Sequence, residues 1–280
     1  MAKANAPRKN WLKSALVRLT SSDIGQQFLE RHVQFMLELM GIGSGSSPSW
    51  SGEKGLGRLL RERYLASGSP LCIFDVGANI GQFLEEVIQP LAAARIPLLA
   101  HAFEPSRQSY EMLEQTFKDH PDFSLNNCAL GEAAGEAELY APAAGSSLSS
   151  FSRRRLDHFG LTFDQSEKVK VRTLDEYCWE KSIEAIDLLK LDVEGHELDV
   201  MQGGARMFRE RRIAIVSFEF GGADIDSRTF LQDFWYFLRD NGAGSLHRLT
   251  PSGRLIPILG YKEIYEQFRP TIFVVLQTEA

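Results

Sequence analysis

The chain has 280 residues, a hydrophobic share of 44%, a charged share of 24% and a net charge of −6. This length allows one large domain with a buried core, and the acidic balance argues against general nucleic-acid binding, which needs a basic surface. The three cysteines, Cys72, Cys128 and Cys178, are widely spaced and odd in number. They therefore give no sign of a disulfide framework and favour a reducing compartment, which we take to be the cytoplasm. The basic start of the chain is interrupted by polar residues, and no apolar run is long enough to span a bilayer, so neither a signal peptide nor a transmembrane segment is expected.

Residues 1–69 are expected to form an N-terminal helical extension with a loop rich in Gly and Ser. Residues 1–22 are polar and are expected to be loose. Residues 23–40 carry a broad apolar face at helical spacing, which predicts a helix. The Gly- and Ser-rich stretch 41–57 is interpreted as a tether, although Trp50 keeps open the alternative of a substrate wall or lid.

From residue 71 onward, strand patterns alternate with helix patterns. Predicted strands cover residues 71–76, 98–103, 123–130, 186–193, 213–220, 246–259 and 268–277. Predicted helices cover residues 56–66, 81–94, 106–119, 197–209 and 229–241. This alternation predicts an α/β domain over residues 70–280, with a doubly wound, mostly parallel sheet. The last two strands are too close in sequence for a crossover helix, so the final strand is expected to be antiparallel, and residues 132–181 are read as an insertion.

The first candidate site is a glycine turn that follows a buried strand and opens a helix. It contains Asp75, Gly77, Ala78, Asn79 and Gly81. The first glycine lets the backbone turn sharply near a ligand, and the second allows close packing where the helix begins. Free amides at such a corner suit a ligand carboxylate, and the aspartate could hold an ammonium group. The spacing is G-x-x-x-G, which differs from the G-x-G-x-x-G of dinucleotide-binding proteins.

Polar residues also end the next two strands. Glu104, followed by Pro105, occupies the position where nucleotide-binding α/β folds place an acid on the ribose hydroxyls. Asn127, Cys128 and Ala129 come at the end of the third predicted strand, beside the first two strand ends. Their amide and backbone groups could contact an adenine edge, or the asparagine could simply form a turn.

The fourth and fifth strands end in a concentration of ionisable residues. Asp192, Glu194 and His196 follow one strand, and Glu219 ends its neighbour. An imidazole titrates near neutral pH, so a histidine flanked by carboxylates is a candidate general base. Asp192 and Glu219 could hold a divalent cation such as Mg²⁺, and a metal-free hydrogen-bond network is an equal alternative. Within the insertion, the run Arg153–Arg155 is interpreted as a solvated face, with contact to an anionic substrate as the alternative.

Several of these motifs, in this order, resemble the FkbM-type methyltransferase family. The resemblance covers about residues 71–277, and its most specific part is the stretch 187–197 followed by Gly203-Gly204-Ala205. It implies a Rossmann-like fold of the class I methyltransferase type and S-adenosylmethionine as methyl donor. It also implies O-methylation of a hydroxyl on a sugar, a glycolipid or polysaccharide, or a secondary metabolite.

The resemblance further implies that residues 75–81 contact the methionine part of the cofactor, Glu104 the ribose and residues 127–129 the adenine. Asp192 is assigned to both the cofactor site and the catalytic site. His196 or Glu194 is expected to be the base. Two rival functions remain at this point: a nicotinamide-dependent Rossmann oxidoreductase, which the glycine spacing disfavours, and a non-catalytic nucleotide-binding module, which would lack an open cleft.

Overall fold

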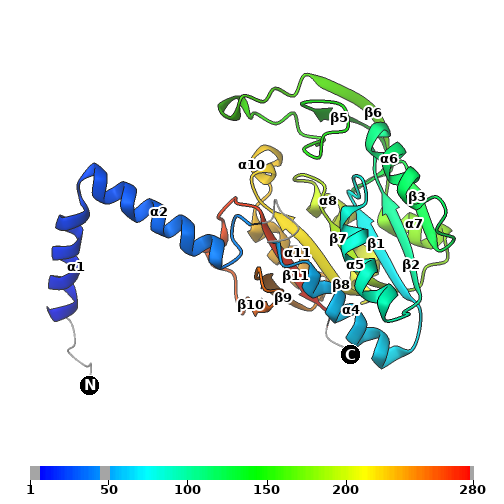
Figure 1. Cartoon of the computed structure of the whole chain (residues 1–280), viewed down its shortest axis with the longest axis horizontal. Helices are drawn as coiled ribbons and strands as arrows, with labels where there is room; N and C mark the ends of the chain where they lie inside the picture. The colour runs from blue at the N-terminus through cyan, green and yellow to red at the C-terminus, as the bar shows by residue number, and fades with distance from the viewer. Residues whose placement is uncertain (1–6, 45–50, 278–280) are drawn as a thin grey trace. The chain divides into compact units, whose positions relative to one another are not determined.

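The computed structural model describes residues 7–44 and 51–277, so Trp50 lies outside the described residues (Figure 1). Contacts divide the chain into two compact units, residues 1–40 and 41–280. The first unit contains α1 (Pro7–Thr20) and α2 (Asp23–Leu39). Ser22 caps α2 by accepting a hydrogen bond from the Gly25 amide at 3.1 Å. The helix predicted over 23–40 is confirmed, and the prediction that residues 1–22 are loose is wrong, because most of them form α1.

The second unit is built on an eight-stranded sheet with the order β10-β9-β11-β8-β7-β1-β2-β3. The strands are β1 (Leu71–Val76), β2 (Leu98–Phe103), β3 (Phe123–Asn126), β7 (Ile186–Leu191), β8 (Ile213–Phe220), β9 (Ser245–Leu249), β10 (Leu255–Pro257) and β11 (Thr271–Leu276). Strands β3, β2, β1, β7 and β8 are parallel, and β11 runs antiparallel between β8 and β9. The predicted Rossmann-like sheet with an antiparallel last strand is confirmed.

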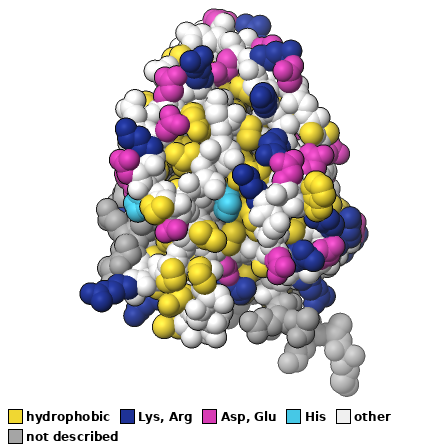
Figure 2. Space-filling model, turned by 90° about the vertical axis from the view of Figure 1, so that its right-hand side faces the viewer, with side chains coloured by type: hydrophobic (Ala, Val, Ile, Leu, Met, Phe, Trp, Pro, Cys, Tyr) yellow, Lys and Arg dark blue, Asp and Glu magenta, His cyan; other side chains and the backbone are white. Residues whose placement is uncertain are grey.

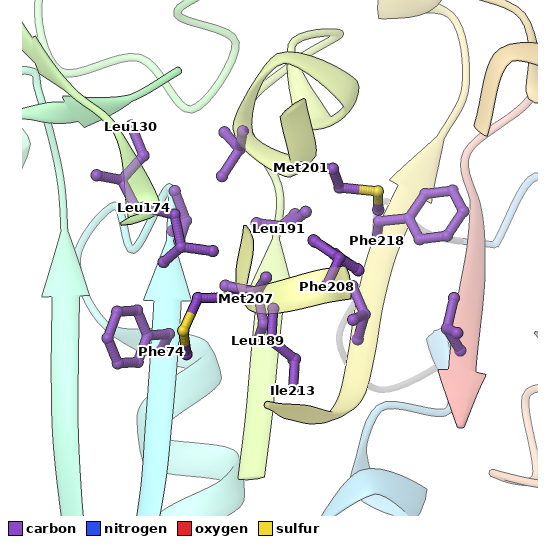
Figure 3. Close-up of a cluster of buried hydrophobic side chains, with 14 of the residues drawn as sticks. Phe74, Leu130, Leu174, Leu189, Leu191, Met201, Met207, Phe208, Ile213 and Phe218 are labelled. Atoms are coloured by element: carbon purple, nitrogen blue, oxygen red, sulfur yellow. The ribbon is translucent and has the colours of Figure 1, made fainter. Parts of the chain in front are cut away.

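Helices cover both faces of this sheet (Figure 1). They are α4 (Lys54–Ser67), α5 (Gln82–Ala93), α6 (Arg107–Phe117), α7 (Leu174–Glu180), α8 (Glu197–Gly203), α9 (Ala205–Arg209), α10 (Ala223–Ser227) and α11 (Leu231–Asp240), with 3-10 turns η1 (Asp157–Phe159) and η2 (Glu263–Tyr265). Successive strand residues point to opposite faces, so Ile73 packs with α4, α5 and α6, and Phe74 packs with α7, α8 and α9. Figure 3 shows the second of these clusters, in which Leu189 and Met207 lie between sheet and helices. Burial of each such side chain stabilises the fold by about 1.5–3 kcal/mol.

A second, three-stranded sheet has the order β4-β6-β5 and carries the insertion. Its strands are β4 (Ala129–Leu130), β5 (Gly135–Ala141) and β6 (Gln165–Arg172). The single strand predicted over 123–130 is therefore wrong: the main sheet ends at Asn126 and β4 pairs with β6 instead. On the surface drawn in Figure 2, acidic and basic side chains are interspersed with apolar ones.

Two further element boundaries differ from the sequence prediction. The strand expected over 246–259 is a hairpin of β9 and β10, turned through Gly253 at φ +75°. The helix expected over 197–209 breaks between α8 and α9 at the glycine pair. A Cβ on Gly203 would lie 2.0 Å from the Gly131 carbonyl oxygen. The missing side chain at Gly203 therefore lets α8 lie against the backbone that follows β4.

Candidate functional site

A cavity of about 720 Å³ lies at the carboxyl ends of the parallel strands. One part is walled by the turn after β1 and by the residues that follow β2. The other part is walled by the loops after β7 and β8 and by the insertion between β5 and β6. Open parallel sheets bind ligands at this edge, and a cavity of this volume is within the usual range for cofactor and substrate pockets.

The glycine turn is held tightly against the loop after β7. Gly77 has φ +79°, and a Cβ there would lie 1.8 Å from the Asp192 carbonyl oxygen. The amides of Gly77 and Ala78 both donate to the Phe103 carbonyl at 3.0 Å, and the Asn79 amide donates to Glu104 Oε2 at 2.8 Å. These three amides are thus engaged inside the protein. A ligand carboxylate at this corner would be left to the amides that begin α5.

The second glycine of the turn serves packing. Gly81 has φ +90°, and a Cβ there would lie 2.2 Å from Cε2 of Phe117 in α6. The start of α5 can therefore lie directly against α6 only because position 81 has no side chain.

Glu104 lines the cavity with 6% of its surface exposed. Its two carboxyl oxygens accept hydrogen bonds from the amides of Asn79 and Ser106, at 2.8 and 2.9 Å. Burial raises the pKa of this carboxyl to about 7, against the lowering effect of these two bonds. A carboxylate offers about four acceptor positions, so two remain for hydroxyl donors.

The other residues expected near the cofactor divide into two groups. Pro105 and Ala129 line the cavity. Asn127 instead donates to the Glu104 and Pro105 carbonyls, at 2.9 and 3.1 Å, and Cys128 is buried in the hydrophobic core. The Asn127 side chain therefore holds the backbone that follows β2, and Cys128 belongs to the hydrophobic core.

Asp75 is fully buried and lies 3.0 Å from Nζ of Lys190, a residue of β7. Burial raises the pKa of Asp75. Burial lowers the pKa of Lys190, but Asp75, Asp192 and Glu53 raise it more, and the net direction is upward. Lys190 also donates to the Gly77 carbonyl at 3.2 Å and lines the cavity. Asp75 therefore pairs with Lys190 of the protein itself, and not with the ammonium group of a ligand as the sequence suggested.

The part of the cavity beside the loops after β7 and β8 is rich in carboxyl groups. Asp192, Glu219 and Glu53 all line it, and the Asp192 side chain is 46% exposed. Burial raises the pKa of Glu219 well above its usual value, and the nearby Asp192 and Glu194 raise it further. Glu53 belongs to the stretch interpreted as a tether, and burial raises its pKa as well. The described part of that stretch thus supplies a wall of the cavity.

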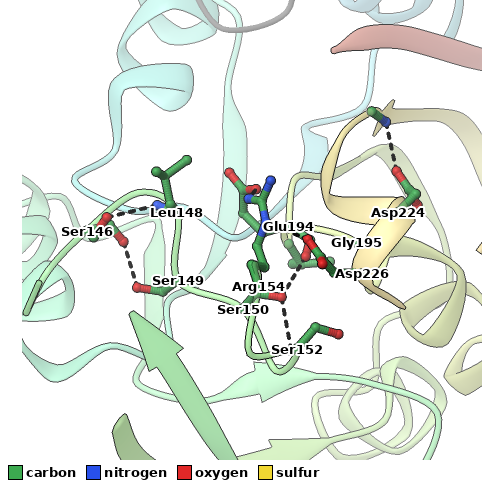
Figure 4. A network of polar contacts seen from close by, with 12 residues as sticks. Ser146, Leu148, Ser149, Ser150, Ser152, Arg154, Glu194, Gly195, Asp224 and Asp226 are labelled. Carbon is green, nitrogen blue, oxygen red and sulfur yellow. Dashed lines mark hydrogen bonds and ion pairs between the residues drawn. The ribbon is translucent and has the colours of Figure 1, made fainter. Parts of the chain in front are cut away.

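Arg154 joins the insertion to the segments that follow β7 and β8 (Figure 4). Its guanidinium bonds Glu194 Oε2 at 2.5 Å and lies 3.6 Å from Asp226, and only 8% of the side chain is exposed. Ser150 Oγ donates to the Glu194 carbonyl at 2.7 Å. The interpretation of residues 153–155 as a solvated face is wrong for Arg154. Burial and the neighbouring Asp192 raise the pKa of Glu194 to about 7, against the lowering effect of the arginine.

Both ring nitrogens of His196 have hydrogen-bond partners. Nδ1 lies 2.7 Å from Asp199 Oδ2, and Nε2 lies 3.1 Å from Ser152 Oγ. With the Nδ1 proton donated to the carboxylate, Nε2 is left as the acceptor, and the ring lines the cavity. Asp199 therefore orients the imidazole that sequence analysis proposed as a base.

The structure adds five residues to those expected from sequence: Glu53, Ser152, Arg154, Lys190 and Asp199. Lys190 lies within the stretch 187–197 and Asp199 follows it, whereas Glu53, Ser152 and Arg154 lie far from the strand-end motifs along the chain. Within the described residues, no group of three or more His, Cys, Asp or Glu side chains could hold a metal ion. The hypothesis of a divalent cation between Asp192 and Glu219 finds no support.

Replacing Arg154 by methionine is expected to destabilise the fold by about 2 kcal/mol, because Glu194 and Asp226 then lose their buried cation. Urea unfolding measures this change, and limited proteolysis should show faster cleavage within residues 142–164. Arg153→Met is the matched control, because that neighbouring arginine forms an exposed pair with Asp164 and should change stability by less than about 1 kcal/mol. Equal effects of the two substitutions would contradict the anchoring role.

Comparison with known proteins agrees with the sequence motifs. Residues 75–243 match the model of the methyltransferase FkbM domain. The chain belongs to the FkbM methyltransferase family. This match contains the glycine turn, Glu104, the insertion and the loops after β7 and β8, so every wall of the cavity except Glu53, Phe268 and Pro270 lies within the FkbM domain.

The chain is similar to the 2-O-methyltransferase NoeI of Sinorhizobium fredii, with 27% identity over 150 residues that cover 50% of this chain and 60% of that protein. Among solved structures, the methyltransferase FkbM from Methylobacillus flagellatus shares 17% identity, with a TM-score of 0.46, over 74% of this chain and 43% of that one. The CMeT domain of the citrinin polyketide synthase shares 10% identity, with a TM-score of 0.45, over 93% of this chain and 58% of that one. The chain thus spans less than two thirds of the length of these relatives. No described helix is long and apolar enough to cross a membrane.

Proposed function

We propose that the chain transfers a methyl group from S-adenosylmethionine to a hydroxyl oxygen of a sugar, a glycolipid or polysaccharide, or a secondary metabolite. The observation that carries this proposal is the single continuous cavity. It joins the turn at Gly77 and the carboxyl of Glu104 to the oriented imidazole of His196. An open cavity of this kind also disfavours a purely structural, non-catalytic module.

The cofactor side of the cavity fits a nucleoside with a charged amino-acid tail. Glu104 keeps two acceptor positions, which match the two adjacent hydroxyls of a ribose. Gly77 lines the cavity beside Glu104, and the half-exposed carboxyl of Asp192 would balance positive charge on the ligand. S-adenosylmethionine, when bound, supplies an electrophilic methyl group on a positively charged sulfur.

The acceptor side supplies alignment and a proton acceptor. Nε2 of His196 takes the proton of the acceptor hydroxyl, and Asp199 stabilises the resulting imidazolium. Glu194 is the second candidate base, although its carboxyl is engaged by Arg154. Holding the hydroxyl in line with the methyl group contributes a large part of the acceleration.

The lining of the acceptor side suits a polyhydroxylated ring. Three serines and two aromatic rings from the insertion face the cavity: Ser146, Ser147, Ser149, Phe151 and Phe159. Hydroxyls can pair with sugar hydroxyls, and aromatic faces pack against the apolar side of a sugar ring. The relative NoeI is a 2-O-methyltransferase, which supports oxygen as the methylated atom.

Calorimetry and a labelled-methyl assay test the proposal. The purified chain is titrated with S-adenosylmethionine, S-adenosylhomocysteine and NAD, and is then incubated with labelled donor and a panel of sugars, lipids and polyketides. We expect affinity for the first two ligands and label on a hydroxyl oxygen. Absence of affinity for both sulfur ligands would overturn the assignment, and affinity for NAD alone would favour the oxidoreductase.

The affinity for S-adenosylhomocysteine is expected to rise with pH between about 5.5 and 7.5, because ribose hydroxyls pair best with the carboxylate form of Glu104. The pKa of this carboxyl is raised to about 7, so the group is mostly protonated below that pH. Well below this pKa, the affinity should rise by about tenfold per pH unit. Dissociation constants at several pH values measure it.

Glu104→Gln should remove most of this pH dependence. Glu86→Gln, a change at another cavity-lining glutamate, is the matched control and should retain it. An unchanged slope in Glu104→Gln would assign the titration to a different carboxyl.

A further inference from the structure

The N-terminal helical segment, residues 7–40, carries an apolar surface that no residue of that segment covers. The structure buries none of the residues of α2. The side chain of Ile24 is 82% exposed, and that of Phe35 is 58% exposed. At 100° per residue, the apolar side chains of α2 occupy more than half of its circumference. They are Ile24, Phe28, Leu29, Val33, Phe35, Met36, Leu37 and Leu39.

The polar stripe of α2 is narrow. Glu30, Gln34 and Glu38 follow one another at intervals of four residues and lie on the same side of the helix. Four charged residues interrupt the 17 residues of α2, so the helix is suited to lie flat in an interface and not to cross it.

The stretch that precedes α2 is strongly basic. Residues 1–22 contain five Lys and Arg and no Asp or Glu, whereas the whole chain has a net charge of −6. Trp11 in α1 is 73% exposed, and tryptophan favours the boundary between water and lipid. Apolar area and positive charge are thus adjacent in one short segment.

We propose that the N-terminal helical segment docks on a membrane surface that displays anionic lipid headgroups. The apolar side of α2 enters the boundary between headgroups and acyl chains, and the basic residues around α1 pair with lipid phosphates. Stable attachment of a peripheral protein takes two such contributions together. A second copy would cover the apolar side alone, whereas an anionic membrane also supplies partners for the basic residues around α1, and we therefore take the membrane as the occupant.

Vesicle co-sedimentation of the full chain tests this docking. We expect binding to vesicles of phosphatidylcholine mixed with phosphatidylglycerol and weak binding to phosphatidylcholine alone. Phe35→Asp should lower the partition coefficient at least roughly tenfold, since it places a charge on the inserted face. Gln34→Asp adds the same charge on the polar stripe and is the matched control, with an expected change of less than about twofold.

The pair Lys13→Glu and Arg18→Glu should remove the preference for anionic vesicles. Circular dichroism of each variant verifies that the helices persist. Equal binding to both vesicle types overturns the anionic requirement. Absence of binding to either vesicle type overturns the docking. The oligomeric state then shows what covers the apolar side of α2. A dimer that Phe35→Asp dissociates would assign it to a second copy, and a monomer would assign it to the rest of the chain. The assay contains no methyl donor, so its outcome is independent of the proposed function.

Discussion

Replacing His196 by glutamine should lower kcat about 10²–10⁴-fold while the affinity for the methyl donor stays nearly unchanged, as expected for loss of a general base. The geometry gives the reason. Asp199 holds Nδ1 at 2.7 Å, so Nε2 is the accepting nitrogen, and the acceptor hydroxyl must take the place of Ser152 Oγ, which lies 3.1 Å from it. Glutamine keeps a polar side chain of similar length but cannot take up the proton. Single-turnover transfer with labelled donor, measured beside calorimetric donor binding, separates the two effects.

The matched control is His158→Gln, because His158 also lines the cavity and belongs to the 3-10 turn of the insertion. It should leave kcat within about threefold of the wild-type value if it contributes only to the pocket wall. Asp199→Asn tests the orienting role and should lower kcat while donor affinity persists. Full turnover in His196→Gln combined with loss in Glu194→Gln would make Glu194 the base. Full turnover in both would exclude each of them.

Gly77→Ala should destabilise the fold by more than about 4 kcal/mol, among the largest effects of a single substitution. The added methyl group would sit 1.8 Å from the Asp192 carbonyl oxygen, and the backbone has φ +79°. Relief requires the loop after β7 to move, so donor binding should be lost even in protein that remains folded. Thermal unfolding and donor titration measure the two consequences, with a melting temperature lowered by about 10 °C.

Gly68→Ala is the control that separates backbone strain from collision. Gly68 has φ +69°, and a Cβ there would meet nothing within 4 Å. This variant bears the left-handed strain alone, at a cost of about 1–2 kcal/mol, and should bind the donor normally. If both alanine variants melt at the same temperature and bind alike, the close approach of the two loops does not matter for the site.

The sequence specifies the sheet well where apolar strands and helices alternate. The strand predicted over 213–220 coincides with β8, and the final antiparallel strand is present. Predictions fail where pairing partners are remote. The residues over 123–130 are predicted as one strand, yet β4 leaves the main sheet because β6 pairs with it from more than forty residues away. The helix expected over 197–209 is broken at the glycine pair 203–204, and no local pattern reveals the close approach of Gly203 to the Gly131 carbonyl.

The candidate site is predictable to the extent that it follows strand ends. Glu104, Asp192, Glu194, His196 and Glu219 do line one cavity, because parallel strands finish at a common edge. Their partners are not predictable in this way, since tertiary contacts decide them. A run of three arginines is typical of solvent exposure, and only the folded insertion buries the middle one. Likewise, an aspartate at a helix start suits the helix dipole, and its bond to the imidazole becomes visible only in three dimensions.

The contact between Gly77 and Asp192 joins the turn after β1 to the loop after β7. Under the proposed function the donor meets the turn and the methyl acceptor meets the loop, and these two segments cannot shift independently. Occupancy of either site therefore changes the free energy of occupying the other, and by thermodynamic reciprocity both affinities change by the same factor. Titration of the donor with and without a methyl acceptor, and the reverse titration, should show this factor as equal in both dissociation constants.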